Sequence, residues 1–336
     1  MNSGTAAGPI PEMSSFSNMD AIATQALRRS FKGDIEAVRD LDLTVSGGEI
    51  FGFLGPNGAG KTTTVRMLCT LLPPTSGSAT VAGLDVVARP ADVRRRIGVA
   101  LQEIGLDPVQ TGRELLELQC GLYGIAGKRA RARTDELLEL VGLTEAADRF
   151  TKTYSGGMKR RLDLASALVH KPEVLFLDEP TTGLDPASRL TVWEEVRRIN
   201  HEGATIFLTT QYLEEADKLC DRLAIIDNGL IVAEGTPEQL KAQMGHDVVS
   251  VSLNGADPGA TEAALAELEG LERTVRAPEA LALYVEDGAG SIPEIVRRLD
   301  RDQIEVGAIS VSRPSLDDVF LRATGRRLEV DEEEQP

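Results

Sequence analysis

The chain lacks any apolar stretch of the roughly 18 residues that a membrane-spanning helix needs, and no charged start and apolar middle mark a signal peptide. We therefore expect that, if the protein serves a membrane, it does so from outside the bilayer. Cysteine is scarce, and Cys69, Cys120 and Cys220 are an odd number without metal-ligand spacing. This pattern predicts reduced thiols in a cytosolic protein.

Basic residues are outnumbered by acidic ones. Lysine and arginine total 36 against 53 aspartates and glutamates, which gives a formal net charge of −17. An acidic balance disfavours non-specific attachment of the whole surface to nucleic acid or to anionic lipid. Sustained heptads are also missing. We therefore expect no nucleic-acid partner.

A glycine-rich segment, GPNGAGKTT, follows the apolar run EIFGFL and precedes the helix-like TTTVRMLCTLL. A strand, a glycine-rich turn and a helix are the context of a phosphate-binding P-loop, which makes an accidental match less plausible. Lys61 is predicted to reach the β- and γ-phosphates of a nucleoside triphosphate, and the Thr62 hydroxyl to hold Mg²⁺. The residues predicted to surround the phosphates are Gly55, Pro56, Asn57, Gly58, Ala59, Gly60, Lys61, Thr62 and Thr63.

Two carboxylates close a second apolar run, VLFLDEP at Val174–Pro180. A buried strand holds its last residues at the carboxyl edge of a sheet, where α/β proteins bind ligands. Asp178 is predicted to order Mg²⁺ or its water, and Glu179 to polarise the water that attacks the γ-phosphate. Alone, the pattern is also typical of a strand end with acidic caps, but the phosphate loop favours the functional interpretation.

Ser155, Gly156 and Gly157 lead directly into an amphipathic helix, about twenty residues before the paired carboxylates. As in the glycine-rich segment before Lys61, backbone N–H groups at a helix N-terminus are expected to face an anion here. A serine N-cap would explain the triplet by itself. Its position before DEP and GLDP favours a second anion-binding element.

Length and pattern predict about two domains. Strands are expected at 23–31 and 37–45, and helical patterns dominate a subdomain at about 86–160. Short apolar strands then alternate with helices, which predicts a mainly parallel, buried sheet. The expected order is a disordered leader at 1–20 (with Met13 or Met19 as alternative starts), a nucleotide-binding domain at 21–245, a ferredoxin-like β-α-β-β-α-β domain at 246–325 and an acidic tail at 326–336.

With these motifs in this order, the chain resembles the nucleotide-binding subunit of an ATP-binding cassette (ABC) transporter from about Thr24 to Gly245. The resemblance implies a P-loop NTPase fold of class α/β, with an antiparallel β subdomain and an inserted helical subdomain. It implies that Phe31 stacks on adenine, and that Gln102 contacts Mg²⁺ and water and senses the membrane partner. It also places Asp185, in GLDP, in the loop that crosses a dimer interface.

In that family two copies face each other head to tail. Each ATP lies between the phosphate loop of one copy and the signature serine and glycines of the other. The resemblance therefore implies a homodimer, ATP and Mg²⁺ as ligands, and a separate integral membrane permease.

Three residues depart from the family pattern. Met158 replaces the usual glutamine of the signature, and Phe31 replaces a tyrosine, although a core phenylalanine is the alternative interpretation. Gln211 stands where the family has a switch histidine; its amide can bind a phosphate oxygen but cannot shuttle a proton. We assign catalytic roles to Glu179, Gln211 and Lys61 on this basis.

The segments TTQYLEEAD, YSGGM and RPSLDDVFL resemble ATP-binding subunits of daunorubicin/doxorubicin-type drug resistance exporters, where glutamine is usual at the switch position. The implied function is ATP-driven efflux of an amphiphilic drug or antibiotic by a protein held at the cytoplasmic face of the membrane. Lipid or polysaccharide export, a non-transport ATPase of the same superfamily and a weakly hydrolysing nucleotide-gated module are the alternatives.

Two kinds of surface segment stay open. Basic runs at 94–96, 128–133 and 159–161 are explained by solvated helix faces, with contact to an acidic permease segment or to lipid headgroups as the alternative. Ser315–Phe320 is either an N-capped helix that packs its Leu and Phe, or a partner surface.

Overall fold

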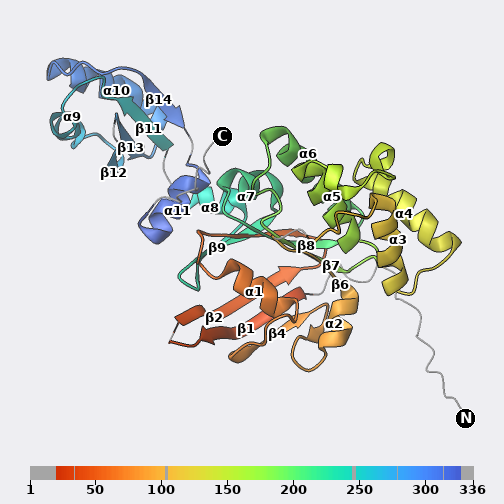
Figure 1. Ribbon diagram of the computed structural model, residues 1–336. Coiled ribbons are helices and arrows are strands. Elements are labelled where there is room, and N and C mark those ends of the chain that lie inside the picture. The colour runs from red at the N-terminus through yellow and green to blue at the C-terminus, as the bar shows by residue number, and fades with distance from the viewer. Residues whose placement is uncertain are drawn as a thin grey trace, which may run out of the picture. The chain divides into compact units, whose positions relative to one another are not determined.

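The computed structural model describes residues 20–326 apart from 34, 103–104, 244–246, 278 and 313 (Figure 1). Residues 1–19 of the expected leader, both alternative start residues and residues 327–336 of the expected tail lie outside this part of the chain. Two compact units meet in the sequence between Glu234 and Gly235. Among the described residues, none of the helices has the length and apolar character needed to cross a bilayer.

Six strands form the main sheet of the first unit, in the order β10-β9-β3-β8-β7-β6. The pairs from β9 through β3, β8 and β7 to β6 are parallel, and every residue of β3, β7 and β8 is buried. Continuous apolar runs suit strands that are covered on both faces, and the predicted mainly parallel sheet is confirmed. The strands are β3 (Ile50–Leu54), β6 (Ile97–Ala100), β7 (Val174–Asp178), β8 (Thr205–Thr210), β9 (Arg222–Asp227) and β10 (Leu230–Gly235).

The first unit also contains a four-stranded antiparallel sheet, in the order β2-β1-β4-β5. Its strands are β1 (Asp20–Phe31), β2 (Ile35–Ser46), β4 (Ser76–Val81) and β5 (Leu84–Asp85). Helix α1 (Lys61–Leu68) shares one apolar core with both sheets, in which Val38, Met67 and Phe207 are buried. This core fixes the start of α1 against the end of β3, where the phosphate loop lies.

The other face of the main sheet packs on a second apolar core that contains Leu116, Leu162 and Trp193. The remaining helices of this unit are α2 (Pro90–Arg96), α3 (Gly112–Leu122), α4 (Lys128–Leu140), α5 (Gly156–Ala167), α6 (Pro186–His201) and α7 (Leu213–Leu219). Strand β6 pairs with β7 in the main sheet. The helical part of the chain therefore follows Ala100, and the expected start near residue 86 is too early.

From β11 to β14 the second unit has the element order β-α-β-β-α-β, with one further helix at each end, and its four-stranded antiparallel sheet has the order β12-β13-β11-β14. Its elements are α8 (Pro237–Ala242), β11 (Asp247–Ser252), α9 (Pro258–Leu265), β12 (Leu271–Arg276), β13 (Ala280–Val285), α10 (Gly288–Arg301), β14 (Ile309–Ser312) and α11 (Leu316–Thr324). Because α8 packs against α11, this unit begins at Gly235, before the boundary expected at 245. Ser315 and Asp318 cap α11 reciprocally, and Leu316 and Phe320 are buried, as the packing interpretation requires.

Candidate active site

The phosphate loop connects the end of β3 to α1, which begins at Lys61 as expected. At two positions of the loop only glycine fits, because any side chain would collide with a neighbouring backbone oxygen. Gly60 has a φ of 108°, and a Cβ there would collide with the carbonyl oxygen of Ala37. At Gly55 a Cβ would collide with the carbonyl oxygen of Ile226. The loop is therefore packed closely against β2 and β9, and these backbone contacts fix its path.

Lys61 is buried, and its ammonium group lies inside this loop. Nζ donates to the carbonyl oxygens of Gly55 at 2.7 Å and Pro56 at 3.1 Å, and it lies 3.1 Å from Oε1 of Glu179. Burial lowers the pKa of Lys61, while the carboxylate of Glu179 raises it. The loop thus holds one positive charge at its centre, in the position to bind a terminal phosphate oxygen.

Thr62 and Asp178 bring hard oxygen ligands together beside the loop. Thr62 Oγ1 lies 3.3 Å from Asp178 Oδ1, which also accepts a hydrogen bond of 2.6 Å from Thr209 Oγ1. Among the described residues no group of three or more His, Cys, Asp and Glu side chains forms a metal site. Magnesium suits such a place, since it commonly takes one or two protein oxygens and fills its other positions with phosphate and water.

Glu179 follows directly on β7 with a φ of 49°, a left-handed conformation that costs a non-glycine residue energy. Its N–H donates to the Thr209 carbonyl oxygen at 3.2 Å and to the Thr209 hydroxyl at 3.0 Å. Thr182 Oγ1 donates to its other carboxylate oxygen at 3.3 Å. The carboxylate is therefore held at the end of β7, facing Lys61.

Gln211 follows β8, the strand between β3 and β7, and is buried. Its Oε1 atom has no hydrogen-bond partner among the described residues. A buried acceptor without a partner costs about 1–3 kcal/mol. The amide is thus available to a water molecule or to a ligand at the edge of the sheet.

The signature segment presents an exposed helix end. Ser155 caps α5, with Oγ accepting from the N–H of Met158 at 3.3 Å, and both Ser155 and Gly156 are exposed. Gly157 packs on Ser188, and a Cβ at residue 157 would force the Ser188 side chain to shift. Asp185 caps α6, and its hydrogen bond with the Ser188 hydroxyl contributes most to lowering its pKa. The signature and the GLDP loop therefore lie side by side at the surface.

The two remaining predicted contacts are also exposed. Phe31 ends β1 with 40% of its surface accessible, so the alternative of a core phenylalanine is wrong. The Arg29 guanidinium lies 4.7 Å from the centre of the Phe31 ring. Gln102 lies in a bend shortly after β6. Among the described residues, no hydrogen bond or ion pair joins Phe31 or Gln102 to Lys61, Asp178 or Glu179.

Arg160 and Glu215 are buried polar residues that the sequence analysis missed. Arg160 belongs to the basic run at 159–161, which was expected to be solvated, but only 4% of its surface is accessible. Its spacing from Leu164 and Ala167 puts it on the buried stripe of α5, a signal that was readable in advance. Glu215 accepts hydrogen bonds from Thr181 Oγ1 at 2.9 Å and Trp193 Nε1 at 2.8 Å.

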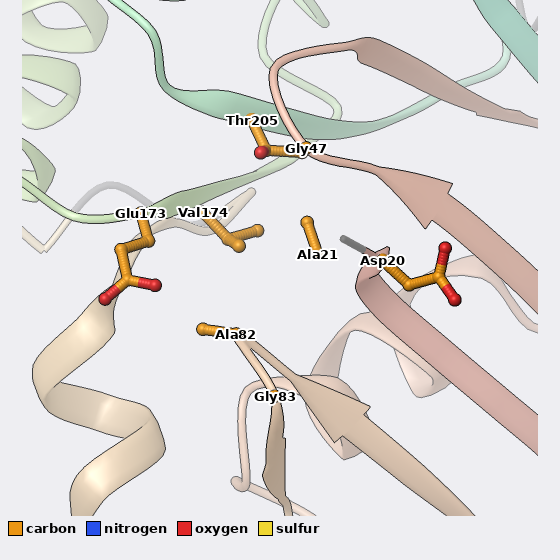
Figure 2. A pocket seen from close by; sticks show the side chains of 8 residues that line it. All are labelled: Asp20, Ala21, Gly47, Ala82, Gly83, Glu173, Val174 and Thr205. Carbon is orange, nitrogen blue, oxygen red and sulfur yellow. The ribbon is translucent and has the colours of Figure 1, made fainter. Parts of the chain in front are cut away.

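A small cavity of about 30 Å³ lies at the opposite, amino-terminal ends of β7 and β8, marked by Val174 and Thr205 (Figure 2). Asp20 and Glu173 line it, but Figure 2 shows their carboxylates pointing away from each other. A space of this size holds about one water molecule. The chemistry-bearing groups gather at the other edge of the sheet.

A parallel sheet with a phosphate loop at the end of β3 and a carboxylate pair at the end of β7 defines a P-loop nucleoside triphosphatase. A family model described as ABC transporter matches residues 38–182, and one described as ATP-binding protein DrrA1-3-like, C-terminal domain matches residues 235–324. The chain belongs to the ATP-binding subunits of ABC transporters, in the daunorubicin/doxorubicin resistance branch. It is an ATPase, the ATP-hydrolysing subunit of an exporter.

The relatives cover nearly the whole chain. A daunorubicin resistance ATP-binding protein of Streptomyces coeruleorubidus is 46% identical over 92% of this chain and 96% of its own length. A Nod factor export ATP-binding protein I of Burkholderia thailandensis is 45% identical over 87% of this chain and 93% of its own. A solved ATP binding subunit of an ABC transporter aligns with 67% of this chain and 93% of its own, at a TM-score of 0.61 and 28% identity.

Proposed function

We propose that Lys61, Thr62, Asp178 and Glu179 form the hydrolytic half-site for MgATP. The observation that carries this proposal is their convergence at the carboxyl ends of β3 and β7, with Lys61 3.1 Å from Glu179 and Thr62 3.3 Å from Asp178. Lys61 and the loop N–H groups bind the phosphates, while Thr62 and Asp178 hold Mg²⁺, which neutralises charge on the phosphate oxygens. Phe31 stacks on adenine, and Gln102 contributes a magnesium or water contact.

Glu179 is the proposed general base. Once a γ-phosphate oxygen binds the Lys61 ammonium, the Glu179 carboxylate loses that partner. It can then accept a proton from the attacking water. Gln211 stays neutral at every physiological pH, so its part is to orient water or phosphate by hydrogen bonding. Its buried, unpartnered Oε1 supports that role.

A second copy of the chain completes the site in this proposal. Ser155 and Gly156 form an exposed helix end that has the chemistry to bind phosphate. Asp185, on the adjacent loop, would cross the interface to the other copy. ATP then joins the two copies, and hydrolysis releases them, a ligand-shifted equilibrium that can move an attached membrane protein.

A groove of about 370 Å³ between the main sheet and the helical part is the proposed docking place for the permease. It combines the apolar Leu71 and Leu101 with the charged Arg94 and Asp163. An amphipathic segment of a partner fits such a lining. Docking there would hold the subunit at the cytoplasmic face of the membrane. The second unit, an α+β domain, is proposed to be accessory or regulatory.

The proposed cargo is a drug- or antibiotic-like amphiphile, supported by the name of the Streptomyces relative, a daunorubicin resistance protein. Export of a lipid or polysaccharide is the second candidate, and the relative described as a Nod factor export protein, at nearly equal identity, favours keeping it. Transport assays in vesicles with both classes of compound separate the two.

The site is tested by phosphate release from the chain assembled with its permease. The wild type is expected to turn over, Glu179→Gln to lose about 10²–10⁴-fold in kcat, and Lys61→Ala to lose MgATP binding. Glu194→Gln, an exposed glutamate on α6, is the matched control. Tight MgATP binding by Lys61→Ala, or full turnover by Glu179→Gln, would contradict the assignment.

A further inference from the structure

Arg160 is a buried cation whose donors point at backbone rather than at a single acidic partner. Nε donates to the carbonyl oxygen of Pro180 at 3.0 Å, and Nη2 to that of Asp178 at 3.1 Å. Nη1 donates to the carbonyl oxygen of Leu101 at 2.5 Å and lies 3.4 Å from Asp163 Oδ2. The planar guanidinium is the only side chain with enough fixed donors to satisfy three carbonyls at once.

These carbonyls belong to functional segments that are distant in the sequence. Asp178 and Pro180 stand on either side of Glu179, so two bonds from Arg160 fix the backbone that aims its carboxylate. Leu101 directly precedes Gln102. Arg160 itself lies one turn into the helix that Ser155 caps. One side chain thus connects the helix of the signature, the segment before Gln102 and the backbone on either side of Glu179.

Two residues that contact Arg160 also line the proposed docking groove between the main sheet and the helical part. Leu101 and Asp163 both line that groove, and both contact Arg160. A segment seated in the groove would therefore press on two partners of Arg160, whose other bonds end beside Glu179. In a close-packed interior such a displacement is transmitted, since neighbouring atoms leave no space to absorb it.

We propose that Arg160 is a positioning residue that sets the place of Glu179 according to what occupies the groove. The proposal rests on the proposed roles of Glu179 and of the groove. Arg160 touches neither the phosphate loop nor Lys61 in the structure, so its loss changes turnover and leaves nucleotide binding intact.

The test compares Arg160→Lys with Arg161→Lys in the chain assembled with its permease. Arg161 is the matched control, because it is the next residue on α5 and Nη1 donates to the carbonyls of Val141 and Gly142, within the helical part. Arg160→Lys is expected to lower kcat by about 10- to 100-fold, since a small misplacement of a catalytic group has such effects. Its KM for MgATP should stay within about twofold of wild type, and Arg161→Lys should keep both parameters within about twofold.

The proposal is overturned if Arg160→Lys turns over like Arg161→Lys, or if its KM rises in proportion to the loss. Should Arg160→Lys fail to fold, Asp163→Asn tests the same link, because it removes the carboxylate beside Nη1 and keeps the side-chain shape. A kcat for Asp163→Asn equal to wild type would then overturn the proposal. A wild type without turnover would instead contradict the proposed function.

Discussion

Lys61 and Glu179 form an ion pair in which 4% and 6% of the respective side chains are accessible. Burying two charges is expensive, and the pair persists because each is also hydrogen bonded, Lys61 to two loop carbonyls and Glu179 to Thr182. In the proposed mechanism a phosphate oxygen competes with Glu179 for the same ammonium. Nucleotide binding would then release the proposed general base from its ion pair.

Asp163 gives a prediction on pH. Burial raises its pKa from 3.8 to about 6, although Arg160 opposes the shift. Between these two pH values the folded state binds more protons than the unfolded state. The contribution of Asp163 to the free energy of unfolding therefore falls as the pH rises from about 4 to 6. Above pH 6 its ionised carboxylate lowers the free energy of unfolding by up to about 3 kcal/mol. Asp163→Asn is expected to be more stable than wild type at pH 8 and to differ less at pH 4. Urea unfolding at both pH values measures it.

If the free energy of unfolding had the same pH dependence in the wild type and in Asp163→Asn, this prediction would be wrong. The expected gain in stability also makes the variant suitable for kinetic work, because a fall in its kcat cannot then be attributed to unfolding.

Most of the half-site was predictable from residues that are adjacent in the sequence. Lys61 and Thr62 belong to one glycine-rich turn, and Asp178 and Glu179 end one apolar run, so the strand-end rule places both pairs at the same edge. Arg160 was not predicted, because a basic run on a helix ordinarily faces solvent. Its spacing from Leu164 and Ala167 indicates a place on the buried stripe of α5, but the carbonyls that accept its hydrogen bonds come from two other segments, and no local pattern reveals them.

Two contacts one turn apart on α6 hold the segment after Gln211. The Arg189 guanidinium lies 4.5 Å from the centre of the Tyr212 ring, and Trp193 Nε1 donates to Glu215 at 2.8 Å. Glu215 also accepts from Thr181, two residues after Glu179. Helices α6 and α7 and the loop after β7 are thereby fixed to one another, and burial raises the pKa of the Glu215 carboxyl.

Trp193→Phe is expected to destabilise the fold by about 1–3 kcal/mol, since it removes one donor from a fully buried carboxyl group. Urea unfolding followed by circular dichroism measures the change, because Trp193 is the only tryptophan and its fluorescence is lost. Glu214→Gln, on the exposed side of α7, is the control and should change stability by less than about 0.5 kcal/mol. A Trp193→Phe variant as stable as this control would show that the contact contributes nothing.

At the scale of elements, alternation of apolar runs and helices correctly predicted the parallel sheet and the β-α-β-β-α-β order of the second unit. Boundaries were less predictable. The sequence at ADVRRRIGVALQE predicts a basic helix that runs into a strand, and only the pairing of β6 with β7 assigns that strand to the main sheet rather than to the helical part. Helix α8 likewise joins the second unit through its packing on α11, a contact between distant segments.

On the scale of the molecule, two helix ends of the first unit are proposed to bind phosphate, and their surroundings differ. The start of α1 lies beside buried Lys61 and Glu179, whereas Ser155 and Gly156 at the start of α5 are exposed. Asp185 is exposed next to them, and Gly157 packs on Ser188 of the same surface. In the proposed dimer, this exposed helix end and the exposed capped loop beside it are the surface that a second copy of the chain would contact.

Whether MgATP joins two copies through these helix ends is decided by the molar mass of Glu179→Gln, measured by light scattering after size-exclusion chromatography. With MgATP we expect a dimer that holds two ATP molecules. Without nucleotide, or with Ser155→Arg added, we expect a monomer, because the large side chain blocks the exposed helix end. A Glu179→Gln protein that binds MgATP but stays monomeric at high concentration, alone and beside its permease, would contradict the proposed dimer.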